Sequence, residues 1–311
     1  MGEAMIISAS YRTDIPAFYA EWFLRRLEAG EARVRSPYSG KPVAVDLRPR
    51  SVTGFVFWTR NFGPLLHRLE ALKAFGRPFV VQFTVTGYPR SVEAAVIEPD
   101  KATEQIRRLS SEVHPKCAVW RYDPILFTSE LTSDFHRRNF ERLAARLEGA
   151  VDEVVVSFAQ IYRKSERNLN AAAGRAGFAW RDPADEEKLA LLPDLCAMAR
   201  ARGMQLTVCT QPQFVGAGAE EARCIDVRRL SAIAGCALEA PLQGNRPGCA
   251  CYQSRDIGEY DTCPHGCAYC YAVRHRALAT RRYREHDPTA DSLIPLAAAP
   301  PAELPLFDPS R

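Results

Sequence analysis

The 311-residue chain lacks several features that would assign it at once to a broad class of protein. It has no apolar run that approaches the length of a membrane span, so we expect no membrane partner. Its first residues, MGEAMIISASYRTD, contain no basic region followed by a long apolar segment. We therefore expect no secretion signal and predict a cytoplasmic location.

A strong excess of charge of one sign is also missing. The chain has 41 Lys and Arg against 37 Asp and Glu, a formal net charge of +4, which does not indicate nucleic acid as a partner. No glycine-rich loop of the GxGxxG or GxxxxGK kind follows an apolar run, which weakens the case for a nucleotide-binding fold. With 47% hydrophobic residues, the chain can still bury a sizeable core.

Short apolar runs rich in β-branched residues alternate with longer amphipathic stretches, which predicts an α/β fold with a parallel sheet. The regular repetition favours a full or partial (β/α) barrel, TIM-like, over an open doubly wound sheet, and we assign its repeats to residues 1–210. The cysteine-rich residues 211–286 are expected to complete the same domain. The proline-rich residues 287–311 are expected to be extended or mobile. The predicted strands are 5–10, 54–59, 79–86, 117–122, 152–159 and 205–210.

Polar residues follow these predicted strands repeatedly. In a barrel the carboxyl ends of the strands meet at one rim, where active sites lie. We therefore select as catalytic candidates the residues Arg12, Asp14, Arg121, Asp123 and Gln160. The arginines suggest an anionic substrate or a cofactor carboxylate, although each candidate could instead cap a helix or form a structural ion pair.

Cysteine, in contrast, is plentiful, with ten residues of which eight fall between positions 209 and 270. Clustered cysteines in a reducing compartment more often bind metal or carry out chemistry than form disulfides. Three of them, Cys263, Cys267 and Cys270, have the spacing Cys-x3-Cys-x2-Cys in the segment CPHGCAYC. Thiolates suit an iron–sulfur cluster or zinc, and zinc would need a fourth ligand from His265, His275 or a distant cysteine.

The segment CPHGCAYC resembles the cluster motif of the radical S-adenosylmethionine (radical SAM) enzymes, with Tyr269 at the aromatic position before the last cysteine. The resemblance implies that Cys263, Cys267 and Cys270 hold a 4Fe–4S cluster and that Tyr269 lies near the adenine of S-adenosylmethionine. It also implies reductive cleavage of S-adenosylmethionine to a 5′-deoxyadenosyl radical, which acts on a substrate that we cannot name. The electron would come from a reducing partner such as flavodoxin or ferredoxin.

The whole chain more closely resembles an uncharacterised bacterial family that carries this cysteine cluster near its C-terminus, in the setting CACYQSRDIGEYDTCPHGCAYCYA. In most radical SAM enzymes the motif follows the first strand. Here SRDIGEY, the cysteine loop and a helix from Val273 form a strand–loop–helix unit at the end of the barrel, which suggests a circular permutation. We therefore expect this last strand to pair in parallel with the first, and the helix from Val273 to pack beside the helix from Ala17.

Four further cysteines, Cys209, Cys224, Cys249 and Cys251, could form an auxiliary iron–sulfur site. They could equally be ordinary semi-buried thiols, and Cys236 is a possible substitute ligand. No Gly-Gly-Glu follows a strand, so the residues that would bind the methionine amine stay unassigned. The alternative to an enzyme is a non-catalytic binding protein stabilised by zinc or an iron–sulfur cluster.

Overall fold

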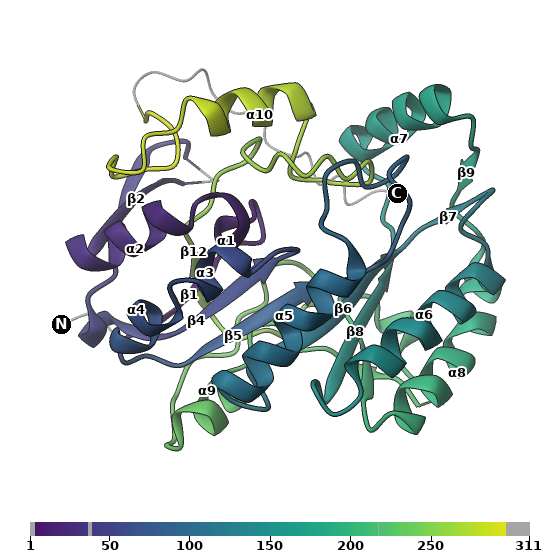
Figure 1. The fold of residues 1–311 in the computed structure, drawn as a ribbon, viewed down its shortest axis with the longest axis horizontal. Helices are drawn as coiled ribbons and strands as arrows, with labels where there is room; N and C mark the ends of the chain where they lie inside the picture. The colour runs from purple at the N-terminus through teal and green to yellow at the C-terminus, as the bar shows by residue number, and fades with distance from the viewer. Residues whose placement is uncertain (1–3, 37–38, 217, 297–311) are drawn as a thin grey trace.

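The computed structural model describes residues 4–36, 39–216 and 218–296. At its centre is an eight-stranded sheet in which every neighbouring pair of strands is parallel (Figure 1). The α/β fold with a parallel sheet is therefore confirmed, and each of the six predicted strands is present with ends within three residues of the prediction. The strands are β1 (Met5–Ala9), β4 (Val52–Thr59), β5 (Phe79–Thr84), β6 (Ala118–Ile125), β8 (Glu153–Phe158), β10 (Gln205–Val208), β11 (Glu220–Glu221) and β12 (Ser254–Asp256).

The sheet is open in the described part of the chain. Its order is β11-β10-β8-β6-β5-β4-β1-β12, so β11 and β12 are the two edges and do not pair with each other. The prediction of a full barrel is not confirmed. Both edge strands are short, and the chain between them folds over one face of the sheet instead of adding strands that would close it.

Helices and small ribbons surround the sheet. Two ribbons are antiparallel pairs, β2 (Glu31–Arg35) with β3 (Pro42–Asp46) and β7 (Phe127–Thr128) with β9 (Trp180–Arg181). Single 3₁₀ turns span Pro49–Ser51 and Pro212–Phe214. The helices are α1 (Ile15–Phe18), α2 (Ala20–Ala29), α3 (Gly63–Leu66), α4 (Leu69–Ala74), α5 (Pro99–Glu112), α6 (Ser133–Leu147), α7 (Arg163–Ala176), α8 (Asp185–Ala201), α9 (Val227–Ala234) and α10 (Arg276–Arg284).

The two faces of the sheet belong to two different cores, because successive side chains of a strand point to opposite sides. On β4, Phe55 and Phe57 join the large core formed with helices such as α2, α5, α6 and α8. Val56 between them joins a second core, which residues of the segment 222–252 cover, Leu230 of α9 among them. We call this second side the cysteine face. The cysteine-rich segment therefore packs on the sheet formed by the first 210 residues.

The last strand of the sheet is positioned as the sequence predicts. β12 pairs in parallel with β1, with Ile6 opposite Ser254 and Ser8 opposite Asp256. The predicted final helix begins at Arg276 as α10 and packs beside α1, since the ring centroids of Tyr283 and Phe18 are 5.3 Å apart. Both parts of the topology prediction are confirmed. The end of the chain therefore supplies the strand next to the first one.

A buried carboxylate joins β12 to β1. Asp256 accepts hydrogen bonds from Ser8 Oγ at 2.8 Å and Ser10 Oγ at 2.7 Å, and it forms an ion pair with Arg12 Nε at 2.9 Å. The side chains of Arg12 and Asp256 are each only 3% exposed. A Cβ at Gly258 would lie 2.0 Å from Ser10 Oγ, so only glycine lets the backbone approach this closely. The beginning and end of the sheet are thus held together by polar contacts.

Residues 287–296 contain no helix or strand and lie against α2 and β2. Trp22 Nε1 donates to Ala290 O at 3.0 Å, and the backbone N–H of Arg33 donates to Asp291 O at 2.8 Å. The rest of the segment predicted to be extended or mobile, 297–311, lies outside the described residues. Within the described ranges, no helix combines the length and apolar character needed to cross a bilayer. The cytoplasmic location stays a prediction.

Burial of His136 on α6 makes the stability of the fold depend on pH. Its Nε2 faces Leu126 O at 3.0 Å, and because a carbonyl only accepts, this nitrogen donates. Its Nδ1 then accepts from Tyr122 Oη at 2.9 Å, which is the bonding of a neutral ring. Burial lowers the pKa of His136 from 6.5 to about 4.

We expect the free energy of unfolding to fall as pH drops through the window from 6.5 to about 4. The unfolded chain takes up a proton on His136 below 6.5 while the folded one does not, so roughly 3 kcal/mol is lost across the window. Urea unfolding at a series of pH values measures this loss. A His136→Asn variant should be less stable at neutral pH but lose less on acidification, whereas replacing the exposed His67 should change nothing. Equal pH slopes for wild type and His136→Asn would contradict the prediction.

Candidate functional site

The segment Cys263–Cys270, which we call the cysteine loop, lies at the carboxyl ends of the strands. The backbone N–H of Ala268 donates to Val92 O at 2.9 Å, and that of Ala95 donates to His265 O at 2.8 Å, so the segment following β5 holds the loop from one side. Gly266 turns the chain with φ 75°, and a Cβ there would lie 2.5 Å from Arg276 Cδ. The backbone angle favours glycine at this position, whereas the flexible Arg276 side chain could move aside.

A buried carboxylate positions one side of the cysteine loop. Asp14 Oδ2 accepts from His265 Nε2 at 2.8 Å and from the backbone N–H of Arg60 at 2.8 Å. Asp14 Oδ1 accepts from Thr59 Oγ1 at 2.7 Å and from the backbone N–H of Ala17 at 3.0 Å. Asp14, selected as a catalytic candidate, thus ties the cysteine loop to the ends of β1 and β4. Its oxygens are fully occupied by these contacts.

The other ring nitrogen of His265, Nδ1, faces Ala95 O at 3.3 Å. Both nitrogens therefore point to oxygen acceptors and not to the cysteine thiols. His275, the second histidine considered as a zinc ligand, is exposed at the start of α10. In the described residues, no three or more His, Cys, Asp or Glu side chains are arranged to hold a metal ion. His265 therefore directs neither ring nitrogen at the loop thiols, as a fourth zinc ligand would have to do.

Tyr269 is fixed from the other side by a buried ion pair. Arg60 Nη1 lies 2.9 Å from Glu93 Oε1, and Thr86 Oγ1 donates to the same carboxylate oxygen at 2.6 Å. The Tyr269 hydroxyl donates to Glu93 and accepts from Arg60. Burial raises the pKa of Tyr269 well above its ordinary value, so the phenol stays neutral. The aromatic side chain of the motif, Tyr269, is thus held in place by two buried partners.

Sequence reasoning did not select Glu93. It lies in the segment after β5 with no motif around it, and only its contacts in the folded chain reveal it. Arg60 directly follows β4, so the general pattern of polar residues after strands already pointed to it. A pocket of about 160 Å³ adjoins these two residues. That is below the roughly 300–1,000 Å³ of typical ligand pockets, so it does not enclose a ligand the size of S-adenosylmethionine.

As whole residues the three cysteines of the loop are partly exposed, but their sulfur atoms are surrounded by protein. Burial raises the pKa of Cys267 to about 12 and raises that of Cys270. The pKa of Cys263 is raised well above its ordinary value, first by burial and then by the charges of Asp14, Cys270 and Cys267. The thiols are thus close enough to influence one another. Without a metal they stay protonated at neutral pH, and a metal centre would bind with release of their protons.

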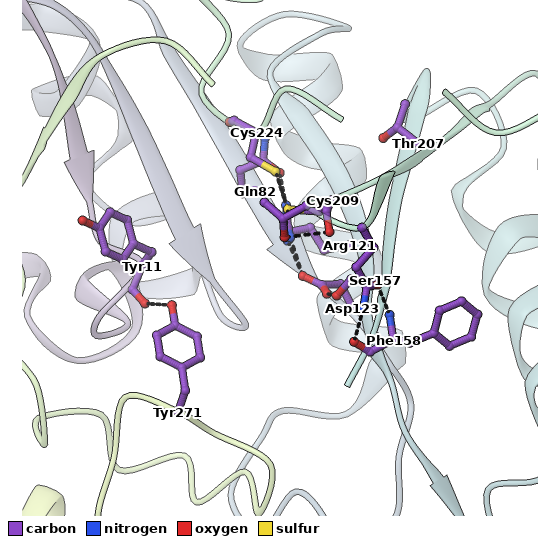
Figure 2. A network of polar contacts seen from close by, with 12 residues as sticks. Tyr11, Gln82, Arg121, Asp123, Ser157, Phe158, Thr207, Cys209, Cys224 and Tyr271 are labelled. Carbon is purple, nitrogen blue, oxygen red and sulfur yellow. Dashed lines mark hydrogen bonds and ion pairs between the residues drawn. The ribbon is translucent and has the colours of Figure 1, made fainter. Parts of the chain in front are cut away.

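Arg121 and Asp123 lie apart from the loop, on the cysteine face. Arg121 Nη1 donates to Cys224 Sγ at 2.9 Å and to Gln82 Oε1 at 3.1 Å, while its Nε donates to Asp123 Oδ2 at 3.0 Å. Ser157 donates to the other oxygen of Asp123. Figure 2 shows these side chains joined in a row. β6 and β8 therefore contribute a second group of polar side chains, separate from the Asp14 contacts.

The four cysteines considered as an auxiliary site are neighbours in space. Cys224 Sγ lies 3.5 Å from Cys209 Sγ. The Cys251 thiol lies near those of Cys224 and Cys249, close enough for the groups to affect one another's pKa. We call these four residues the thiol chain. Cys236 is exposed and takes no part, while Cys117 and Cys196 are buried in the large core.

The remaining two catalytic candidates have simpler surroundings. Arg12 binds Asp256, as described above, and therefore serves to join strands. Gln160 is exposed and accepts a hydrogen bond from Tyr162 Oη at 2.7 Å. The ring of Tyr162 lies 6.5 Å from that of Tyr271, the residue that follows the cysteine loop. The five candidates therefore divide between the loop, the strand junction, the cysteine face and the surface.

The family of the chain follows from its comparison with known proteins. The family model described as a domain of unknown function (DUF1848) matches residues 6–272. The chain belongs to this family. The DUF1848 match covers all of the sheet except the first residue of β1, includes the thiol chain and the cysteine loop, and ends before α10. No curated protein and no solved structure matches the chain.

Proposed function

We propose that this DUF1848 protein is a radical SAM-type enzyme whose cysteine loop holds a 4Fe–4S cluster. The observation that carries the proposal is the position of the loop. The unit formed by β12, the loop and α10 lies next to β1 at the edge of a parallel sheet, and the three cysteines of the loop follow the carboxyl end of β12. With β12 counted first, the strand order is sequential, as in a partial barrel whose first unit has moved to the end of the chain.

The residues around the loop fit such a cluster. Three thiols on one short loop provide three soft ligands, and the nearby His265 and Asp14 are occupied with each other. A 4Fe–4S cluster bound by them would keep one iron free of protein ligands. When bound with S-adenosylmethionine and reduced by a partner such as flavodoxin or ferredoxin, the cluster would supply a 5′-deoxyadenosyl radical to an unidentified substrate.

Side chains around the loop would fix its backbone, orient Tyr269 and compensate the charge of a thiolate. Asp14 and His265 would fix the backbone of the loop relative to β1 and β4. Glu93 and Arg60 would hold the ring of Tyr269 where the motif places an aromatic residue. The Arg60 guanidinium lowers the pKa of Cys267 against the larger effect of burial, which favours the thiolate that a metal needs.

Anaerobic reconstitution with iron and sulfide tests the proposal. We expect brown protein that releases 5′-deoxyadenosine when it is reduced in the presence of S-adenosylmethionine. The competing proposal is a non-catalytic binding protein stabilised by zinc or by an iron–sulfur cluster. Colourless protein with stoichiometric zinc, or a brown protein that does not cleave S-adenosylmethionine, would contradict the enzyme and favour this alternative.

A further inference from the structure

We infer that the thiol chain, Cys209, Cys224, Cys249 and Cys251, binds a second iron–sulfur cluster on the cysteine face of the sheet. This site shares no ligand with the cysteine loop and does not rest on the function proposed above. It brings together three separate segments: the residue after β10, the turn before α9, and the segment that leads to β12. Thiols this far apart in sequence meet only because residues 222–252 fold over the sheet.

The spacing of the sulfur atoms suits shared metal ligation. Two thiolates on one tetrahedral metal, with bonds of about 2.3 Å, lie about 3.8 Å apart. Cys209 Sγ and Cys224 Sγ are 3.5 Å apart, and Cys251 lies near Cys224 and Cys249. A disulfide would need a sulfur–sulfur distance of about 2 Å. The measured separation is therefore compatible with two ligands of one metal atom and too long for a disulfide bond.

Two donors point at the sulfur atoms from the protein. Arg121 Nη1 donates to Cys224 Sγ at 2.9 Å, and the backbone N–H of Ile225 donates to Cys251 Sγ at 3.4 Å. Hydrogen bonds of this kind stabilise thiolate ligands and tune the reduction potential of iron–sulfur clusters. The buried guanidinium also offsets part of the negative charge that four thiolates and a metal centre would bring. An ordinary packed cysteine needs neither contact.

The arrangement favours a cluster over a single ion. Four thiolates with tetrahedral preferences suit either zinc or an iron–sulfur cluster. A single zinc ion requires its four ligands to surround one point. The four sulfur atoms form a row, each next to the following one. A centre with several metal atoms can take two ligands at one end of such a row and two at the other.

The test uses a full-length variant in which Cys263, Cys267 and Cys270 are all replaced by alanine, so that the loop cluster cannot form. After anaerobic reconstitution with iron and sulfide, we expect this loop variant still to bind about two to four irons per chain, with matching sulfide and visible absorption. Adding Cys249→Ala and Cys251→Ala should reduce the remaining iron by about tenfold or more. Adding Cys236→Ala instead should leave it unchanged, because Cys236 is exposed and outside the thiol chain.

Circular dichroism of the metal-free proteins checks that each variant is folded. If the double replacement unfolds the chain, the single Cys249→Ala change at the partly exposed end of the thiol chain replaces it. Arg121→Gln should shift the reduction potential of the second cluster downwards, since a positive charge next to Cys224 favours the reduced form. An unshifted potential would contradict the role given to Arg121.

Three outcomes would overturn the inference. The loop variant could bind no iron with sulfide, bind zinc alone, or show a disulfide between Cys209 and Cys224 in place of two titratable thiols. None of them bears on the cysteine loop, whose function is measured by S-adenosylmethionine cleavage in the protein with Cys263, Cys267 and Cys270 intact. The loop variant therefore tests the second cluster, and the protein with an intact loop tests the proposed enzyme activity.

Discussion

Replacing any one of Cys263, Cys267 or Cys270 with alanine is expected to abolish S-adenosylmethionine cleavage by the reconstituted protein. The neighbouring His265 directs both ring nitrogens at oxygen atoms, so the loop has no spare ligand to replace a lost thiol. We expect cleavage to fall by more than about 100-fold, beyond the 10–100-fold cost of losing a residue that only orients a ligand. Release of 5′-deoxyadenosine per protein, measured anaerobically, gives the result directly.

Matched variants separate ligand loss from general damage to the fold. Cys236→Ala changes an exposed cysteine and should leave cleavage at the wild-type level. Asp14→Asn removes a charge that positions His265 and should give an intermediate loss of iron and activity, about 10–100-fold. Retention of cleavage in two of the three single cysteine variants would rule out the loop as the site of the cluster.

Much of the fold could be predicted from the sequence because its signals are local. Each of the six predicted strands is an apolar run bounded by turns, and each was found. The parallel pairing of β12 with β1 was also predicted, since a circularly permuted barrel places the last strand beside the first and its loop at the same end as the other strand ends. Closure of the sheet could not be predicted in this way. It depends on whether residues 211–253 extend the sheet or cover its face, and their composition of Gly, Pro and Cys permits both.

The roles of the site residues were harder to predict, for a physical reason. A charged residue at a strand end can serve a ligand or a buried partner, and the partner of Arg12 is 244 positions away. Glu93 could not be selected from the sequence for the same reason. Its ion pair with Arg60 and its contact with Tyr269 join three segments that are distant in the sequence. The cysteines were easier, since their clustering in the sequence already suggested which of them would meet.

The contact between Arg12 and Asp256 leads to the second large expected effect. Asp256→Ala should lower the free energy of unfolding by about 3–5 kcal/mol, because it leaves the buried Arg12 guanidinium without its carboxylate. Two serine hydroxyls, of Ser8 and Ser10, lose their acceptor in the same variant. Urea unfolding of the metal-free protein measures the loss. The exposed ion pair of Arg25 with Glu21 provides the control, and Arg25→Ala should cost no more than about 1 kcal/mol.

The same variant tests whether this junction holds the cysteine loop in place. Because β12 is a three-residue edge strand, its pairing with β1 depends heavily on the Asp256 contacts, and weakening them should expose residues 257–275 to limited proteolysis. The double variant Arg12→Ala/Asp256→Ala should be less destabilised than the sum of the two single variants, since it leaves no unpaired buried charge. Additive effects, or an Asp256→Ala loss below about 1 kcal/mol, would mean that the ion pair does not hold the two ends of the chain together.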